Sequence, residues 1–243
     1  MDIQKNSLVN GLAYALATAG AIVGEVQDLH LLAYICRPLM LLILSSWFFF
    51  NSRRVGDRFT LLIQAGLLFS MAGDAFLMFQ HLDQFNFLVG LGAYLIGLLC
   101  YIMAFTYNIT EVGGGEGPLV PLAISVLVVA FLFLFGARMV PYVEDGVSMP
   151  LLIFGSANAA LSITAAFRFG RTFVRSFLMV TLGTFFFIGS NSLLATNRFM
   201  VPLDHSDWSI LLTYAIAQYL VVAGCLVHVL DPEEIRRKAA LVT

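Results

Sequence analysis

Residues 118–137 read PLVPLAISVLVVAFLFLFGA, a run of twenty residues that contains no charged side chain. A helix of this length, at about 1.5 Å per residue, spans the roughly 30 Å of hydrocarbon in a bilayer. Pro118 and Pro121 stand at its start, where a helix tolerates proline. The run therefore predicts a transmembrane helix, and the rest of the chain follows the same pattern.

The composition of the whole chain is that of a membrane protein. Of its 243 residues, 60% are hydrophobic and 12% are charged, whereas about 25% are charged in an ordinary soluble domain. A bilayer can cover this much apolar surface, and a soluble core cannot. The predicted spans are about 8–25, 30–50, 59–80, 86–108, 118–137, 149–167, 175–197 and 207–230. We therefore predict an all-α polytopic protein of about eight transmembrane helices, forming a single integral membrane domain over residues 1–243.

Small residues in two of the spans predict close contacts between helices. Gly20 and Gly24 form a GxxxG pattern in the first span. The fourth span contains Gly90, Gly92 and Gly97.

The basic residues predict how the spans are oriented. Lys and Arg are enriched on the cytosolic side of membrane proteins. Two of them, Arg138 and Arg198, fall on one side, and ten fall on the other: Lys5, Arg53, Arg54, Arg58, Arg168, Arg171, Arg175, Arg236, Arg237 and Lys238. Both termini are therefore predicted to be cytosolic. The loops are short, so any chemistry must come from the helices, and we expect a bacterial inner membrane, with the endoplasmic reticulum as the alternative.

The two halves of the chain contain similar segments. Residues 69–77 (FSMAGDAFL) resemble residues 186–194 (FFIGSNSLL), which aligns Asp74 with Asn191 at an offset of 117. A duplication of four helices in parallel orientation explains this match. Chance similarity between two apolar segments is the alternative.

Polar side chains inside the predicted spans indicate a functional cavity. Ionisable groups within a membrane are costly and usually functional. Counted from the outer end of each span at 1.5 Å per residue, these side chains lie about 9–10 Å deep, with the last one turn deeper. They are Arg37, Asp74, Tyr94, Asn191, Tyr214 and Gln218, from five helices. We predict that they meet in the outer half of the membrane; the alternative is interhelical hydrogen bonding with a structural Arg37–Asp74 ion pair.

Histidines and carboxylates in the outer loops offer a separate hypothesis, a zinc site. They are His30, His81 and His205, with Asp28, Asp83, Asp204 and Asp207 nearby. None of the histidines shows a short paired spacing such as HxxxH. We therefore predict no metal and no cofactor. A net charge of −2 without a basic patch also argues against a nucleic-acid partner.

Two parts of the chain resemble the YhhN-type lysoplasmalogenases. The first is residues 68–78 (LFSMAGDAFLM), followed by Gly90 and Tyr101. The second is residues 183–218, which include GSNSLLA at 189–195 and end on Ala217-Gln218. The resemblance covers spans two to four and seven to eight, and the other spans only by hydropathy.

This resemblance implies an integral membrane hydrolase. Members of the family cleave the vinyl-ether bond of lysoplasmalogens, giving a fatty aldehyde and glycerophosphocholine or glycerophosphoethanolamine. A lysophospholipid and the surrounding membrane lipid would then be the partners. The acid of the family's Gly-Asp pair falls on Asp74, and its basic-residue-Pro pair falls on Arg37-Pro38. Its tyrosine and glutamine in the last span fall on Tyr214 and Gln218.

The chain departs from the family pattern at two positions. The family commonly has Ser-Asp where this chain has Ser190-Asn191. It often has histidine where this chain has Leu98. A second acidic group and a candidate proton carrier are therefore absent from the sequence.

Vinyl-ether hydrolysis requires an acid that is protonated near neutral pH, and burial at low dielectric favours that form. Asp74 is the predicted general acid, and Asn191 shares the catalytic site by positioning water. Five residues are predicted to bind substrate: Arg37, Tyr94, Tyr101, Tyr214 and Gln218. Of these, Arg37 suits the substrate phosphate.

Three other functions stay open. Asn191 and Leu98 favour a non-catalytic membrane protein that binds lysolipid or another small molecule. A transporter is less favoured, because the spans contain a single buried acid and no evident broken helix. A zinc-dependent hydrolase would use the outer histidines. The sequence does not indicate an oligomeric state.

Overall fold

The structure is a computed structural model that describes residues 5–53, 56–80, 82–112, 117–204 and 206–230. Within these ranges there are no strands, and eight helices are long and apolar enough to cross a membrane. The helices are α1 (Ser7–Val26), α2 (His30–Ser52), α3 (Arg58–Met78), α4 (Gln84–Val112), α5 (Leu119–Met139), α6 (Asp145–Ala166), α7 (Val174–Ala195) and α8 (Ser206–Val229). The predicted all-α polytopic fold is confirmed, and the helix ends differ from the predicted spans by at most four residues.

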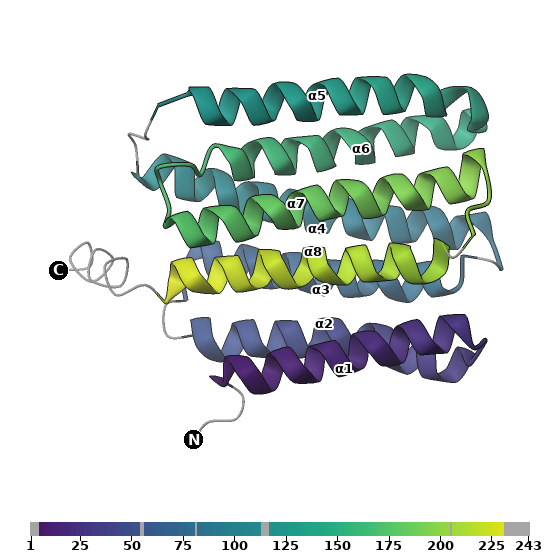
Figure 1. Ribbon diagram of the computed structural model, residues 1–243, viewed down its shortest axis with the longest axis horizontal. Helices are drawn as coiled ribbons and strands as arrows, with labels where there is room; N and C mark the ends of the chain where they lie inside the picture. The colour runs from purple at the N-terminus through teal and green to yellow at the C-terminus, as the bar shows by residue number, and fades with distance from the viewer. Residues whose placement is uncertain (1–4, 54–55, 81, 113–116, 205, 231–243) are drawn as a thin grey trace.

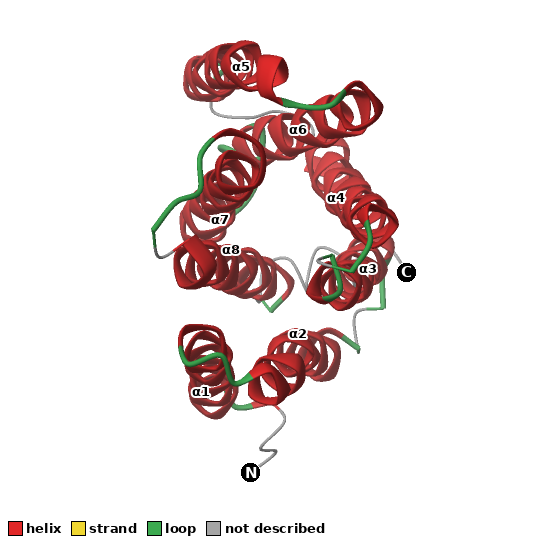
Figure 2. Cartoon of the chain, turned by 90° about the vertical axis from the view of Figure 1, so that its right-hand side faces the viewer, coloured by secondary structure: helices red, strands yellow, loops and turns green. Residues whose placement is uncertain are grey.

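The eight helices lie side by side along one axis (Figure 1). Viewed along that axis, α2, α3, α4, α6, α7 and α8 form a ring, with α1 and α5 outside it (Figure 2). The start of α1 and the end of α8 lie at the same end of the bundle (Figure 1). The cytosolic location of that end stays a prediction, and Arg54, Arg236, Arg237 and Lys238, which contributed to it, lie outside the described residues.

Neighbouring helices follow the same order in the two halves of the chain. Helix α1 packs on α2 as α5 packs on α6, and α3 packs along α4 as α7 packs along α8. Across the halves, α4 contacts α6 and α8 contacts α2. A duplicated four-helix unit would give this arrangement, and the duplication itself stays a prediction.

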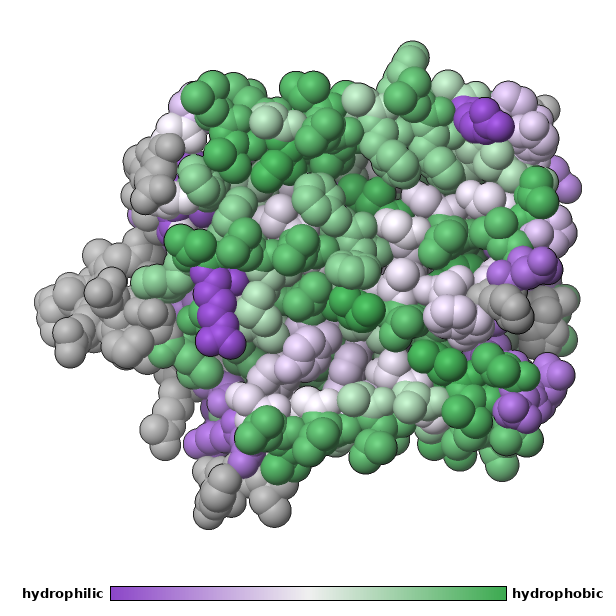
Figure 3. Space-filling model, in the orientation of Figure 1, coloured by the Kyte–Doolittle hydropathy of each residue, from purple (hydrophilic) through white to green (hydrophobic). Residues whose placement is uncertain are grey.

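The outer surface of the bundle is apolar between its two ends. Figure 3 shows hydrophobic side chains over most of one face, with hydrophilic ones mainly toward the ends. Leu16, Leu61 and Phe133 are each at least 65% exposed. Such a surface is stable against lipid and unstable against water. The protein is therefore an integral, multi-pass membrane protein.

Glycine brings two pairs of helices close together. A side chain at Gly24 of α1 would have its Cβ only 2.7 Å from the backbone nitrogen of Ala33 in α2. In α4, a Cβ at Gly97 would lie 3.1 Å from the carbonyl oxygen of Gly66 in α3. The predicted close contacts are therefore present at these positions. Gly92 is different, because a Cβ there would meet nothing within 4 Å.

Candidate active site

A cavity of about 150 Å³ lies between α2, α3, α4, α6, α7 and α8. It is near the end of the bundle where α3 connects to α4 and α7 connects to α8, since residues of these end regions line it. We refer to it as the acid cavity. Its polar lining residues are Arg37, Ser70, Asp74, Gln80, Tyr94, Tyr101, Ser190, Asn191, Asn197, Asp207 and Tyr214. Five of the six predicted intramembrane polar residues therefore line one cavity, and the sixth, Gln218, lies directly behind it.

Asp74 is held from two other helices by tyrosine hydroxyls. The Tyr94 hydroxyl of α4 donates a hydrogen bond to Oδ1. The Tyr214 hydroxyl of α8 donates to Oδ2 at 3.2 Å. The two tyrosine rings pack edge to face, with centroids 5.9 Å apart, which is a favourable aromatic geometry. Both carboxyl oxygens of Asp74 are thus satisfied although the group lies within the membrane.

Gln218 extends this hydrogen-bonded chain away from the cavity. Its Nε2 donates to the Tyr214 hydroxyl oxygen at 3.1 Å, which leaves the Tyr214 proton for Asp74. Its Oε1 accepts from the Tyr101 hydroxyl at 3.3 Å. Gln218 is fully buried and Tyr101 is 1% exposed. The chain of donors ends at Asp74, so burial of these polar groups is compensated by hydrogen bonds.

Two glycines on α3 seat the tyrosines of α4. A Cβ at Gly73 would lie 2.8 Å from the ring of Tyr94, and a Cβ at Gly66 would likewise overlap the ring of Tyr101. Gly66 and Gly73 are seven residues apart, about two helical turns, and so are Tyr94 and Tyr101. The two glycines therefore lie on one face of α3, and the two tyrosines lie on one face of α4. Gly73, the residue before Asp74, therefore determines where the Tyr94 hydroxyl that donates to Asp74 lies.

Arg37 lines the acid cavity, but its ion pair is with Glu25, which is not among the predicted site residues. Its Nη2 lies 2.7 Å from Oε1 of Glu25, near the end of α1. The two side chains are 22% and 26% exposed. In the described part of the chain, the ion pair of Arg37 is therefore with Glu25, and the alternative of an Arg37–Asp74 pair is wrong. The reason is that α1 packs closely on α2, which brings Glu25 to Arg37.

Asn191 is fixed by another amide, Asn158 of α6. The Nδ2 of Asn191 donates to Oδ1 of Asn158 at 2.9 Å, and Nδ2 of Asn158 donates to the Phe154 carbonyl at 3.0 Å. Asn158 is 4% exposed. The Asn191 amide nitrogen is therefore engaged by Asn158, and the Asn191 amide oxygen can accept a hydrogen bond from another donor. Asn158 is not among the predicted site residues, although its polar side chain within an apolar span is the signal that could have found it.

The helix after α7 shapes the mouth of the acid cavity. The chain continues as a one-turn π-helix, η3 (Thr196–Met200), a form that often occurs at functional sites. Arg198 of η3 donates to Oε1 of Gln80 at 2.9 Å and lies 3.9 Å above the ring of Phe87. These contacts join the α7–α8 connection to the α3–α4 connection across the mouth.

The structure leaves the zinc hypothesis largely untested. His81 and His205 lie outside the described residues. His30 stacks on Tyr34 at the start of α2. Within the described ranges, no group of three or more His, Cys, Asp or Glu side chains could hold a metal ion. Leu98, where the family often has histidine, is a buried residue that lines the acid cavity.

The fold and the cavity define a class, the polytopic α-helical membrane proteins with a polar site buried among their helices. The YhhN family model matches residues 32–225, and the chain belongs to this family. The predicted family is thus confirmed. The chain is also similar to lysoplasmalogenase TMEM86A from Homo sapiens, with 32% identity over 164 residues. The match covers 68% of this chain and 65% of the human protein, just under two thirds of its length. No solved structure matches the chain.

Proposed function

We propose that this protein hydrolyses the vinyl-ether bond of lysoplasmalogens. Membership of the YhhN family and the similarity to a human protein named as a lysoplasmalogenase support this activity. The observation that carries the proposal is the position of Asp74, a carboxyl group held by two tyrosine hydroxyls in a cavity among apolar helices. A lysophospholipid already dissolved in the bilayer can reach such a site without passing through water.

The reaction consumes one water molecule and proceeds through three proton transfers. An acid donates a proton to the β-carbon of the vinyl ether, and the electrons of the double bond form the new C–H bond. The resulting oxocarbenium carbon is attacked by water, which loses a proton to the base left behind. The hemiacetal then collapses: its hydroxyl proton passes to the glycerol oxygen and the bond between this carbon and that oxygen breaks, giving a fatty aldehyde and a glycerophospho-alcohol.

Asp74 makes the first two of these proton transfers in the proposed mechanism. As the acid it protonates the β-carbon, and as the carboxylate it accepts a proton from the attacking water. One carboxyl group is therefore sufficient in principle, and Asn191 need not titrate. The carboxamide oxygen of Asn191, oriented by Asn158, accepts a hydrogen bond from the water. Arg37 holds the substrate phosphate, because a guanidinium binds phosphate oxygens well.

Product analysis tests this activity. Purified protein is incubated with a lysoplasmalogen, and the products are followed by mass spectrometry. In deuterated water, we expect a fatty aldehyde with one deuterium on the carbon next to the carbonyl. In heavy-oxygen water, we expect no label in the glycerophospho-alcohol, since the glycerol–oxygen bond is retained. Absence of aldehyde from correctly folded protein contradicts the proposal.

A non-catalytic lysolipid-binding protein of the same fold is the second candidate function. The hydrogen bond between Asn191 and Asn158 favours it, because an amide, fixed by a second amide on α6, stands in the cavity where a second acid would otherwise lie. Equilibrium binding of lysoplasmalogen with no release of aldehyde decides for this candidate.

The proposed location is a bacterial inner membrane. The short connections between the helices support it. The endoplasmic reticulum of a eukaryote is the alternative, since the similar protein named above is human. Localisation of a tagged protein in its own organism distinguishes the two.

A further inference from the structure

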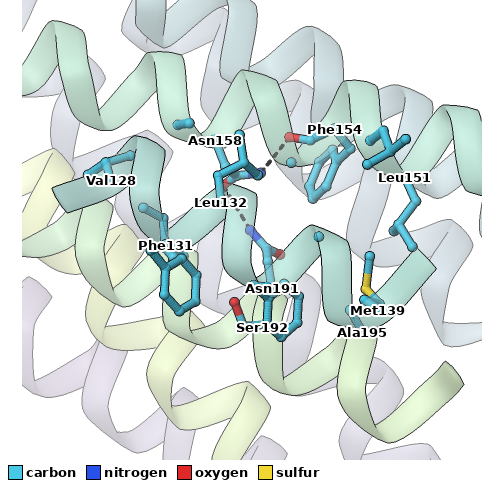
Figure 4. Close-up of a pocket in the computed structure, with 16 residues that line it drawn as sticks. Val128, Phe131, Leu132, Met139, Leu151, Phe154, Asn158, Asn191, Ser192 and Ala195 are labelled. Carbon is cyan, nitrogen blue, oxygen red and sulfur yellow. Dashed lines mark hydrogen bonds between the residues drawn. The ribbon is translucent and has the colours of Figure 1, made fainter. Parts of the chain in front are cut away.

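A second cavity, of about 70 Å³, lies between α5, α6 and α7 (Figure 4). Its walls are mainly aliphatic and aromatic, with Val128 and Leu132 on α5, Leu151 on α6 and Ala195 on α7 among them. We refer to it as the apolar groove. Its polar lining consists of Asn158, Asn191 and Ser192. In contrast to the acid cavity, it has no charged side chain in its wall.

The apolar groove and the acid cavity share a wall. Phe154 of α6 and Asn191 of α7 line both spaces. Figure 4 shows the Asn191 amide joined to Asn158 on one side of this wall. Phe154 is 7% exposed, and rotation of its side chain would join the two spaces. An apolar space thus lies directly beside a charged one, separated from it by two side chains.

The apolar groove also reaches the surface that faces lipid. Two of its lining residues, Phe131 and Leu152, are 42% and 38% exposed. Helix α5 lies outside the ring of helices (Figure 2). The lining on α5 runs from Val128 to Met139, about 16 Å at 1.5 Å per residue. That length matches about half of the roughly 30 Å hydrocarbon core, the depth of one leaflet.

We infer that the apolar groove binds the hydrocarbon chain of a single-chain lipid whose polar part occupies the acid cavity. The shared wall of the two spaces supports this occupant, as do the apolar lining and the leaflet-length walls. The chain enters sideways from the bilayer along α5, and Phe154 moves aside to place the bond between chain and glycerol beside Asn191. The identity of the lipid as a lysoplasmalogen rests on the proposed function.

Photocrosslinking tests where the chain lies without requiring turnover. The probe is a non-hydrolysable alkyl-ether lysophospholipid with a diazirine near the end of its chain, added to the full-length protein in lipid vesicles. We expect labelled residues on α5 and α6 along the apolar groove, displaced by excess lysoplasmalogen. Labelling confined to other helices, or not displaced, overturns the inference.

A matched pair of variants on α5 adds a kinetic test. A Cβ at Gly136 would lie 3.9 Å from Leu152, so Gly136→Phe fills the apolar groove without a backbone clash. Ala130→Phe adds the same ring on an exposed position outside the groove. We expect Gly136→Phe to lose groove labelling and to lower kcat/KM for a long-chain substrate by about tenfold or more, with a smaller loss for a short-chain one.

The outcomes separate the inference from the proposed function. Groove labelling without aldehyde release from the wild-type protein supports the groove as a chain site and refutes the hydrolase. Aldehyde release with labelling elsewhere, and with equal chain-length dependence in both variants, supports the hydrolase and refutes the groove.

Discussion

At the scale of single residues, the site depends on how each polar group within the membrane is compensated. Asp74 receives hydrogen bonds from Tyr94 and Tyr214, and Gln218 directs the Tyr214 proton toward it. Unpaired, these groups would each cost free energy in a low-dielectric environment. The network therefore stabilises these groups and, on the proposed mechanism, is also the means by which the acid is positioned.

Glu25 is predicted to compete with the substrate phosphate for Arg37. Glu25→Gln removes the ion pair, so we expect KM for a lysophospholipid to fall about two- to fivefold, the size expected for a partly exposed pair of roughly 0.5–1 kcal/mol. Arg37→Gln raises KM, and kcat changes little in either variant. Steady-state kinetics measure this, with Asp28→Asn, in the α1–α2 connection, as the control. Equal KM values in all the variants contradict a phosphate role for Arg37.

At the scale of helices, the closest contact near the site is between α3 and α4. Glycine at 66 and 73 on α3 leaves room for the tyrosine rings at 101 and 94 on α4. Because van der Waals contact drives helix association in lipid, this fit contributes to stability as well as to the position of Tyr94. Substitution at these glycines therefore affects both properties together.

Gly73→Ala is predicted to damage the site through Tyr94. Its Cβ would lie 2.8 Å from the ring, so the ring must shift and weaken its hydrogen bond to Asp74. We expect aldehyde release to fall about tenfold and the unfolding temperature to drop, since overpacking costs roughly 1–3 kcal/mol. Gly92→Ala is the control, because nothing lies within 4 Å of its Cβ. Similar behaviour of the two variants contradicts this account.

The positions of the helices in the chain could be predicted from the sequence, but which side of each helix faces its neighbours could not. Long uncharged runs such as residues 118–137 determine where helices cross a bilayer. A lipid-facing side is as apolar as a protein-facing side, so hydropathy does not show how each helix is rotated. Polar residues carry that information, and Asp74, Tyr94 and Tyr214 could therefore be grouped correctly by depth. The partners Glu25, Asn158 and Phe154 depend on which helices are neighbours, and only the structure supplies this.

At the scale of the whole molecule, a ring of six helices surrounds the acid cavity, and α5 adds the apolar groove outside the ring. The cavity lies toward one end of the bundle. Whether that end faces outward decides which leaflet supplies the substrate. The distribution of Lys and Arg predicts the outer leaflet.

Cysteine labelling tests this orientation. Cys36, Cys100 and Cys225 are buried, so the background should be low. We expect a membrane-impermeant maleimide to label Asp204→Cys, in the α7–α8 connection, on intact cells. Thr172→Cys, in the α6–α7 connection, should be labelled only after permeabilisation. The reverse pattern contradicts the predicted orientation.

Aldehyde release by Asp74→Asn is the most direct measurement of whether this intramembrane acid performs the chemistry. Asparagine keeps the shape of the side chain and an acceptor oxygen, but it cannot donate and recover the proton. With Asp83→Asn as an exposed control and thermal unfolding as the check on folding, the account predicts a loss of at least about a hundredfold in kcat for Asp74→Asn alone. A folded Asp74→Asn protein that releases aldehyde at the wild-type rate would contradict it.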